Sequence, residues 1–181
     1  MRKKTNFRWF IRVVFISVAA SMVFTLASTE ILGRAGFVIS FAVLAVFILL
    51  GIVFDVIGVA VTAATESPFH SMGAHRERGA AESLRLVRNA DKVGSFCNDV
   101  VGDVTGIISG TTAALIAARL IQGQGLPAEN LVVPLLISGA VTGLTVGGKA
   151  AGKSIAINNS TAIVLRVGKL INFLRFWSNK K

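Results

Sequence analysis

Long apolar runs separated by polar segments dominate the chain. Four of these runs approach or exceed the length of about 20 residues with which a helix crosses a bilayer. They cover Val13–Thr29, about 35–64, about 96–120 and about 130–150. The only sizeable polar region between them is residues 65–95. This pattern predicts an all-α integral membrane protein with four transmembrane helices.

The polar region between the second and third runs has a helical pattern of its own. Pro68 interrupts the second helix, and Gly79–Val93 has apolar positions at helical spacing with charges on the other face. This spacing predicts a juxtamembrane helical hairpin over residues 65–95 at the cytoplasmic membrane surface. Residues 160–177 show the same alternation and predict a basic amphipathic helix that lies against anionic headgroups.

Basic residues indicate how the spans are oriented, since cytoplasmic flanks carry an excess of Lys and Arg. They gather before the first run, between the second and third, and after the fourth, so that all three groups fall on one side of a four-span protein. We expect a plasma-membrane protein with both termini cytoplasmic. The basic residues in question are Arg2, Lys3, Lys4, Arg8, Arg12, Arg76, Arg78, Arg85, Arg88, Lys92, Lys153, Arg166, Lys169, Arg175, Lys180 and Lys181.

Composition supports the membrane interpretation. Hydrophobic residues make up 53% of the 181 residues, charged residues only 15%, and the mean hydropathy is +0.70. A soluble domain carries about 25% charged residues, and a disordered chain is poorer in apolar ones. We expect residues 1–34 to form an anchor helix and residues 35–181 the main membrane domain. The first run also fits a secretory signal peptide that ends near Ala27, an alternative that leaves the other spans unchanged.

Three acids lie in or beside the apolar runs, where an ionised carboxylate costs about 2.5–3.5 kcal/mol on insertion scales. Asp99 and Asp103 are four residues apart and therefore share one helix face. Oxygen atoms of carboxylates and amides are the ligands that Mg²⁺ takes from proteins. The predicted cation ligands in the spans are Asp103, Asp99, Asp55, Asn98 and Ser109.

The same acids have a structural alternative. They can pair with Lys149 or Lys153 as membrane-embedded ion pairs, which would serve packing or gating. The residues alone leave the two interpretations equally open.

Glycines recur at intervals of four in the third and fourth runs, a spacing that lets helix backbones approach closely in lipid. They predict a tight helix pair or the seam of a dimer. The residues are Gly102, Gly106, Gly110, Gly139, Gly143 and Gly147.

Other motifs carry little chemistry. Residues 147–154 (GGKAAGKS) match a phosphate-binding loop in letters, but no buried strand precedes them, so no nucleotide is expected. His70 and His75 do not have the spacing of a helical metal-ligand pair. Cys97 is the only cysteine, which excludes an intrachain disulfide. Neither an enzyme nor a nucleic-acid-binding protein is expected, because no nucleophile has a triad partner and no aromatic stacking pattern accompanies the basic residues.

Two stretches resemble the DUF21 membrane domain of the CNNM/CorB magnesium transporters. In that family a Gly-Ala helix ends in an Asn-Pro-Asp-Arg-like turn and leads into a span with a Gly-Asn pair. Within Gly79–Gly110, residues 89–92 read Asn-Ala-Asp-Lys and residues 102–103 read Gly-Asp. Within Gly147–Leu174, residues 153–154 stand at the Lys-Ser of the family's Gly-Glu-Ile-Leu-Pro-Lys-Ser segment.

The resemblance covers roughly residues 54–174 and implies three spans, a cytoplasmic hairpin, a dimer and Mg²⁺ transport, with the first helix as an addition. Three departures accompany it. The family's cation-site glutamate falls on Lys149, and its Ser-Glu-Thr-Ala-like stretch reads Val56–Ala60, with Asp55 the only nearby acid. The cytoplasmic CBS and CorC-type domains are absent from this sequence.

Two functions are therefore expected from the sequence. The first is a divalent-cation transporter or transport subunit, with Mg²⁺ as the transported ion, in which the cation passes by alternating access around a site near the membrane centre. The alternative is a non-transporting membrane interaction or scaffold protein in which Lys149 neutralises the ancestral cation site. The expected partners are the lipid bilayer, a second copy of the chain and a divalent cation.

Overall fold

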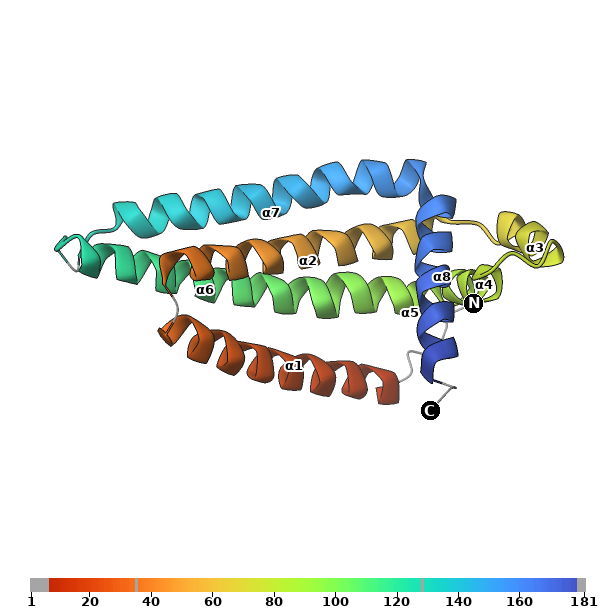
Figure 1. Ribbon diagram of the computed structural model, residues 1–181, viewed down its shortest axis with the longest axis horizontal. Coiled ribbons are helices and arrows are strands. Elements are labelled where there is room, and N and C mark those ends of the chain that lie inside the picture. Colours follow the sequence, from red (N-terminus) through yellow and green to blue (C-terminus); the bar gives the residue numbers. More distant parts are fainter. Residues whose placement is uncertain (1–6, 35, 128, 179–181) are drawn as a thin grey trace. The chain divides into compact units, whose positions relative to one another are not determined.

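The computed structural model describes residues 7–34, 36–127 and 129–178, which are helical apart from short connections (Figure 1). No strand occurs within those ranges. Three helical segments are long and apolar enough to cross a membrane. They are α2 (Phe37–Ala63), the continuous run Ala90–Gly123 and α7 (Val132–Asn158). The all-helical fold class is confirmed, and three of the four expected spans correspond to helices of sufficient length.

The first helix, α1 (Phe7–Arg34), has 28 residues. Within its described part the apolar stretch is Val14–Val23, which is shorter than the candidate spans. The span expected over Val13–Thr29 therefore stays a prediction. The basic residues expected ahead of it, Arg2, Lys3 and Lys4, lie outside the described residues.

The polar region after α2 folds into short helices. These are α3 (Ser67–Ala74), α4 (Ala80–Arg88) and α5 (Ala90–Ser95), and α5 continues through the π-helix η1 (Phe96–Val101) into α6 (Gly102–Gly123). Pro68 lies in the first turn of α3, where a missing backbone N–H costs nothing. α4 packs against α3, α5 and α8. The place of these helices at a membrane surface stays a prediction.

The last helix, α8 (Ser160–Ser178), begins directly after α7. Asn159 forms the turn between them, and its backbone N–H still donates to the Ile155 carbonyl at 3.0 Å. After this turn α8 runs crosswise to the end of α7 (Figure 1). The amphipathic segment expected over residues 160–177 is thus a helix with nearly those bounds.

The chain divides into two compact units, and the three long helical segments contribute residues to both. The first unit contains Met1–Gly51 and Val100–Gly148, and the second contains Ile52–Asp99 and Lys149–Lys181. In the first unit α1 packs against α6, whose Ile108 and Ile116 are fully buried.

The second unit has a small hydrophobic core at the junction of its helices. Five buried residues form it, namely Ala60, Val61, Phe69, Ala156 and Val164. They come from α2, α3, α7 and α8, so that the polar-region helix α3 and the basic helix α8 share one core with two candidate spans.

α4 and α8 cross closely, with one hydrogen bond between them and glycines at the crossing. The buried Ser83 hydroxyl donates to the Val164 carbonyl at 3.1 Å. Gly79, just before α4, has a left-handed φ of 83°, and a Cβ there would lie 2.5 Å from the backbone nitrogen of Lys169. Gly168 faces Ser83 and the Gly79 carbonyl in the same way. Glycines at both positions therefore permit a close crossing of the two segments.

Candidate functional site in the second unit

The π-helix η1 lies in the candidate span Ala90–Gly123 and contains two of the residues that the sequence suggested as ligands. A π-helix inserts a residue into the α-helical ladder and often marks a functional site. Here it directs Asn98 toward Gly58 of α2, so closely that a Cβ at Gly58 would collide with the Asn98 amide and with Cys97. Any residue larger than glycine at position 58 would therefore displace the Asn98 side chain. Nothing in the sequence pattern signalled the π-helix.

The Asn98 carbonyl oxygen Oδ1 is buried without a hydrogen-bond donor. Within the described ranges it shares this condition with only one other side-chain atom, the Thr112 hydroxyl in the first unit. Buried acceptors are normally paired, so an unpaired one calls for a donor, a water or a cation. Thr62, one turn along α2 from Gly58, is already engaged, because its hydroxyl donates to the Gly58 and Val59 carbonyls.

Asp55 lies on the same face of α2, three residues before Gly58. Its side chain is 18% exposed, and its Oδ1 lies 4.0 Å from the Lys149 ammonium of α7, whose side chain is 27% exposed. At that distance the pair is an ion pair without a short hydrogen bond. The partner of Lys149 is therefore Asp55, one of the pairings that the sequence had left open.

The other candidate ligands have different surroundings. Asp99 is exposed in the second unit, and Asp103 is exposed on α6 in the first. Ser109 is buried in the first unit and donates to the Thr105 carbonyl at 2.8 Å. Lys153 is exposed on α7. Among the described residues, no three or more His, Cys, Asp or Glu side chains form a group that could hold a metal ion.

Most of the glycines in the expected stripes face open space in this single chain. A Cβ at Gly106, Gly110 or Gly139 would meet no atom within 4 Å, and the same holds at Gly143 and Gly147. Gly102 is buried. The glycines at close contacts are others, which the interval of four did not select.

Those other glycines lie where helices of the second unit contact one another. Gly94 of α5 faces the Thr62 methyl group, and Gly152 of α7 faces Val56 and Ile52 of α2. With Gly58, they allow both neighbouring helices to approach α2 closely. These glycines lie on different helices and form no repeat within one helix, so their role can be recognised only from the packed structure.

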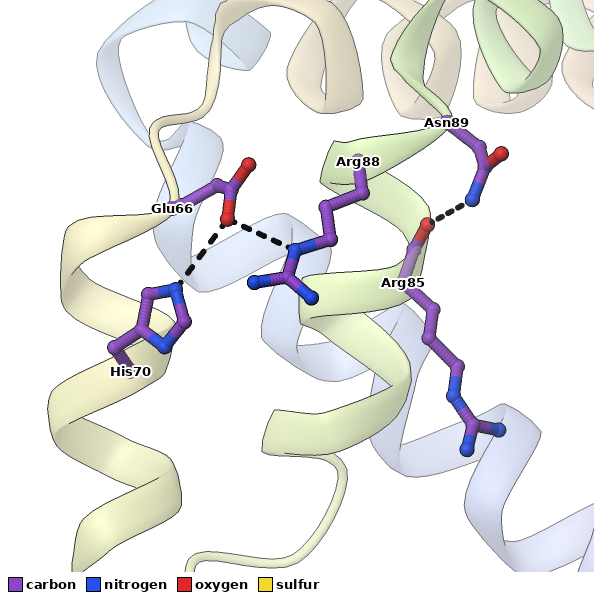
Figure 2. A network of polar contacts seen from close by, with 5 residues as sticks. All are labelled: Glu66, His70, Arg85, Arg88 and Asn89. Carbon is purple, nitrogen blue, oxygen red and sulfur yellow. Dashed lines mark hydrogen bonds and ion pairs between the residues drawn. The ribbon is translucent and has the colours of Figure 1, made fainter.

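Outside the spans, a polar network links α3 to α4 (Figure 2). Glu66 Oε2 accepts a hydrogen bond from Arg88 Nε at 3.0 Å and lies 3.3 Å from His70 Nε2. The hydrogen bond from Arg88 is the main cause that lowers the pKa of Glu66 below its ordinary value. Desolvation opposes it, and the hydrogen bond from His70 adds a smaller lowering effect. Asn89 donates to the Arg85 carbonyl at 2.9 Å, while the Arg85 side chain points away from Glu66.

Comparison with protein-family models, with curated proteins and with solved structures finds no match to this chain. The resemblance to the DUF21 domain therefore rests on the residues quoted above and stays a prediction.

Proposed function

We propose that the chain is a membrane-embedded transport protein, or transport subunit, for a divalent cation such as Mg²⁺. The observation that carries the proposal is the unpaired Asn98 Oδ1, which is buried against Gly58 of α2, a residue one helical turn after Asp55 on the same helix. One or two carboxylates together with amide oxygens and retained waters suit Mg²⁺ as a substrate. The resemblance of residues 54–174 to the DUF21 domain points to the same substrate.

In this proposal Lys149 is the resident counter-ion of Asp55. Its ammonium neutralises the carboxylate while no metal ion is present. An ammonium and Mg²⁺ repel each other when they share one carboxylate, so the lysine must leave Asp55 as the ion arrives. The separation of 4.0 Å and the partial exposure of both side chains leave the lysine free to do so.

The proposal includes a location and an assembly. The chain would lie in the plasma membrane with both termini cytoplasmic, which the distribution of Lys and Arg supports. It would act as a homodimer, which is supported by the open glycine faces of α6 and α7.

A flux measurement with matched variants tests the proposal. The full chain is reconstituted into liposomes that contain a Mg²⁺-sensitive dye, and uptake is followed after external Mg²⁺ is added. Asn98→Leu keeps the side-chain size but removes the acceptor, and we expect it to lower uptake at least tenfold, as Asp55→Asn should. Thr112→Val removes an unpaired buried hydroxyl of the first unit and is the control that should retain uptake. Equal uptake by Asn98→Leu and the native chain would contradict the proposed ligand.

The ion pair favours a second candidate, a membrane interaction protein that does not transport. In it Lys149 and Asp55 form a permanent structural pair. Lys149→Met separates the two candidates. The transport proposal predicts tighter Mg²⁺ binding by this variant, measured by calorimetry in detergent, because the competing ammonium is gone. The second candidate predicts no Mg²⁺ uptake by the native chain. It also predicts that the variant is destabilised by about 1–3 kcal/mol, since the Asp55 carboxylate loses its partner.

A further inference from the structure

A pocket of about 640 Å³ lies in the second unit, beside the crossing of α4 and α8. One side comes from the connection before α4, with Glu77 and Arg78, and the other from the second half of α8. The close approach of Gly79 to Gly168 and Lys169 fixes this connection against α8. The residues that line the pocket are Glu77, Arg78, Lys169, Asn172, Phe173 and Phe176.

The lining combines an anion-binding group with an apolar wall. Lys169 is engaged with Glu77, its Nζ lying 2.9 Å from Oε1, so these two charges cancel. Arg78 is exposed, and no carboxylate among the described residues pairs with it. A guanidinium presents a planar fork of N–H donors that matches a phosphate. Phe173 and Phe176 add apolar surface to the same pocket.

Such a lining suits a phosphate that carries an apolar group. A phospholipid is such a molecule, and the position of α8 favours contact with lipid. α8 starts directly after the candidate span α7 and runs crosswise to its end (Figure 1). Leu170, Leu174 and Trp177 are more than half exposed on this helix. A helix with basic residues and exposed Leu, Phe and Trp is typical of one that lies in the headgroup region of a bilayer.

We infer that this pocket binds the headgroup of an anionic phospholipid from the adjoining leaflet, with Arg78 on the phosphate and the two phenylalanines beside the glycerol and upper acyl chain. The inference does not rest on cation transport. It goes beyond a general attraction of α8 to anionic lipid, because it assigns the preference to one arginine that lies outside α8.

Quenching of Trp177 fluorescence by brominated lipids tests the inference. Trp177 adjoins Phe176 of the pocket, and Trp9→Phe makes it the only tryptophan of the full chain. In vesicles, dibrominated phosphatidylglycerol is mixed with unbrominated phosphatidylcholine, and the reverse mixture gives the reference. We expect the anionic lipid to be preferred about fivefold, the factor that one basic residue contributes near an anionic surface.

Arg78→Met should lower this preference by about that factor. Arg85→Met is the matched control, since Arg85 is an equally charged, exposed residue of α4 outside the pocket, and it should keep the preference. Where Arg78→Met fails to fold by circular dichroism, Arg78→Lys replaces it and must lower the preference, because the donor fork is lost.

Three results would overturn the inference. They are equal quenching by the two brominated lipids, an unchanged preference after Arg78 is replaced, and an equal loss of preference with Arg85→Met. Inorganic phosphate, added at millimolar concentration, should leave the quenching unchanged. If it abolishes the preference, the ligand is free phosphate and the lipid assignment is wrong.

Discussion

At the scale of single residues, glycine has two different uses in this chain. In the expected stripes it leaves the outer faces of α6 and α7 bare, as at Gly106 and Gly139. In the second unit it allows backbones to approach, as at Gly58 and Gly79. The spacing of four residues identifies the first group, because such a spacing is a property of a single helix. The second group appears only when the packing of two elements is known.

Gly79→Ala should destabilise the second unit. The alanine would have to adopt a φ of 83°, and its Cβ would lie 2.5 Å from the backbone nitrogen of Lys169. Strain of this kind costs about 1–3 kcal/mol. We expect a lower apparent Tm in detergent. Gly73→Ala, where the new methyl group meets nothing within 4 Å, is the control and should leave the Tm unchanged or slightly raised. An equal Tm for both variants would contradict the close crossing of α4 and α8.

The candidate site was partly predictable at the same scale. Asp55, Asn98 and Lys149 were all recognisable as polar residues in apolar runs, where burial is costly. The π-helix was not recognisable, because no residue pattern in Phe96–Val101 distinguishes it from an α-helix. The unpaired state of Asn98 Oδ1 and the choice of Asp55 as the partner of Lys149 likewise depend on neighbours from other helices.

At the scale of elements, the contacts of α4 determine how the polar region folds. The apolar periodicity of residues 79–93 identified helix there, since one face must be buried. It did not identify the break at Asn89 or the packing of α4 on α8. Likewise, the helix of the fourth apolar run extends to Asn158, because no proline interrupts it after Gly148 and the turn comes only at Asn159. Helix existence was therefore more predictable than helix ends and partners.

Acidification should weaken the link between α3 and α4. The pKa of Glu66 is lower in the folded chain than in the unfolded chain, so its stabilising contribution is complete above the ordinary value of 4.5 and is lost as the pH falls through the folded pKa. We expect the native chain to lose more thermal stability between pH 7 and about pH 3 than Glu66→Gln does. Because Glu66 is exposed, the difference will be small.

Two arginine variants check the assignment of this link. Arg88→Met removes the hydrogen bond to Glu66 and should reduce the acid dependence as Glu66→Gln does. Arg85→Met leaves the carboxylate paired and should behave as the native chain (Figure 2). An acid dependence that is the same in all four proteins would mean that the Glu66–Arg88 contact contributes nothing.

At the scale of the whole molecule, the testable property is its orientation in the membrane. The distribution of basic residues predicts that residues 65–95 face the cytoplasm and residues 122–129 the other side. In a Cys97→Ala background, single cysteines at two exposed positions report the side. We expect a membrane-impermeant maleimide to label Gln124→Cys on intact cells, and Ser71→Cys only after permeabilisation. Labelling of Ser71→Cys on intact cells would reverse the proposed orientation.

The bond between Ser83 and Val164 also has a consequence for biosynthesis. The two residues are 81 positions apart, and both the Ala90–Gly123 segment and α7 lie between them. A ribosome therefore completes α4 long before the carbonyl that Ser83 needs exists. During that interval the Gly79–Ser83 surface has no α8 to cover it, and a nascent chain released before Val164 keeps it open. α4 therefore reaches its final packing only after α8 has been synthesised.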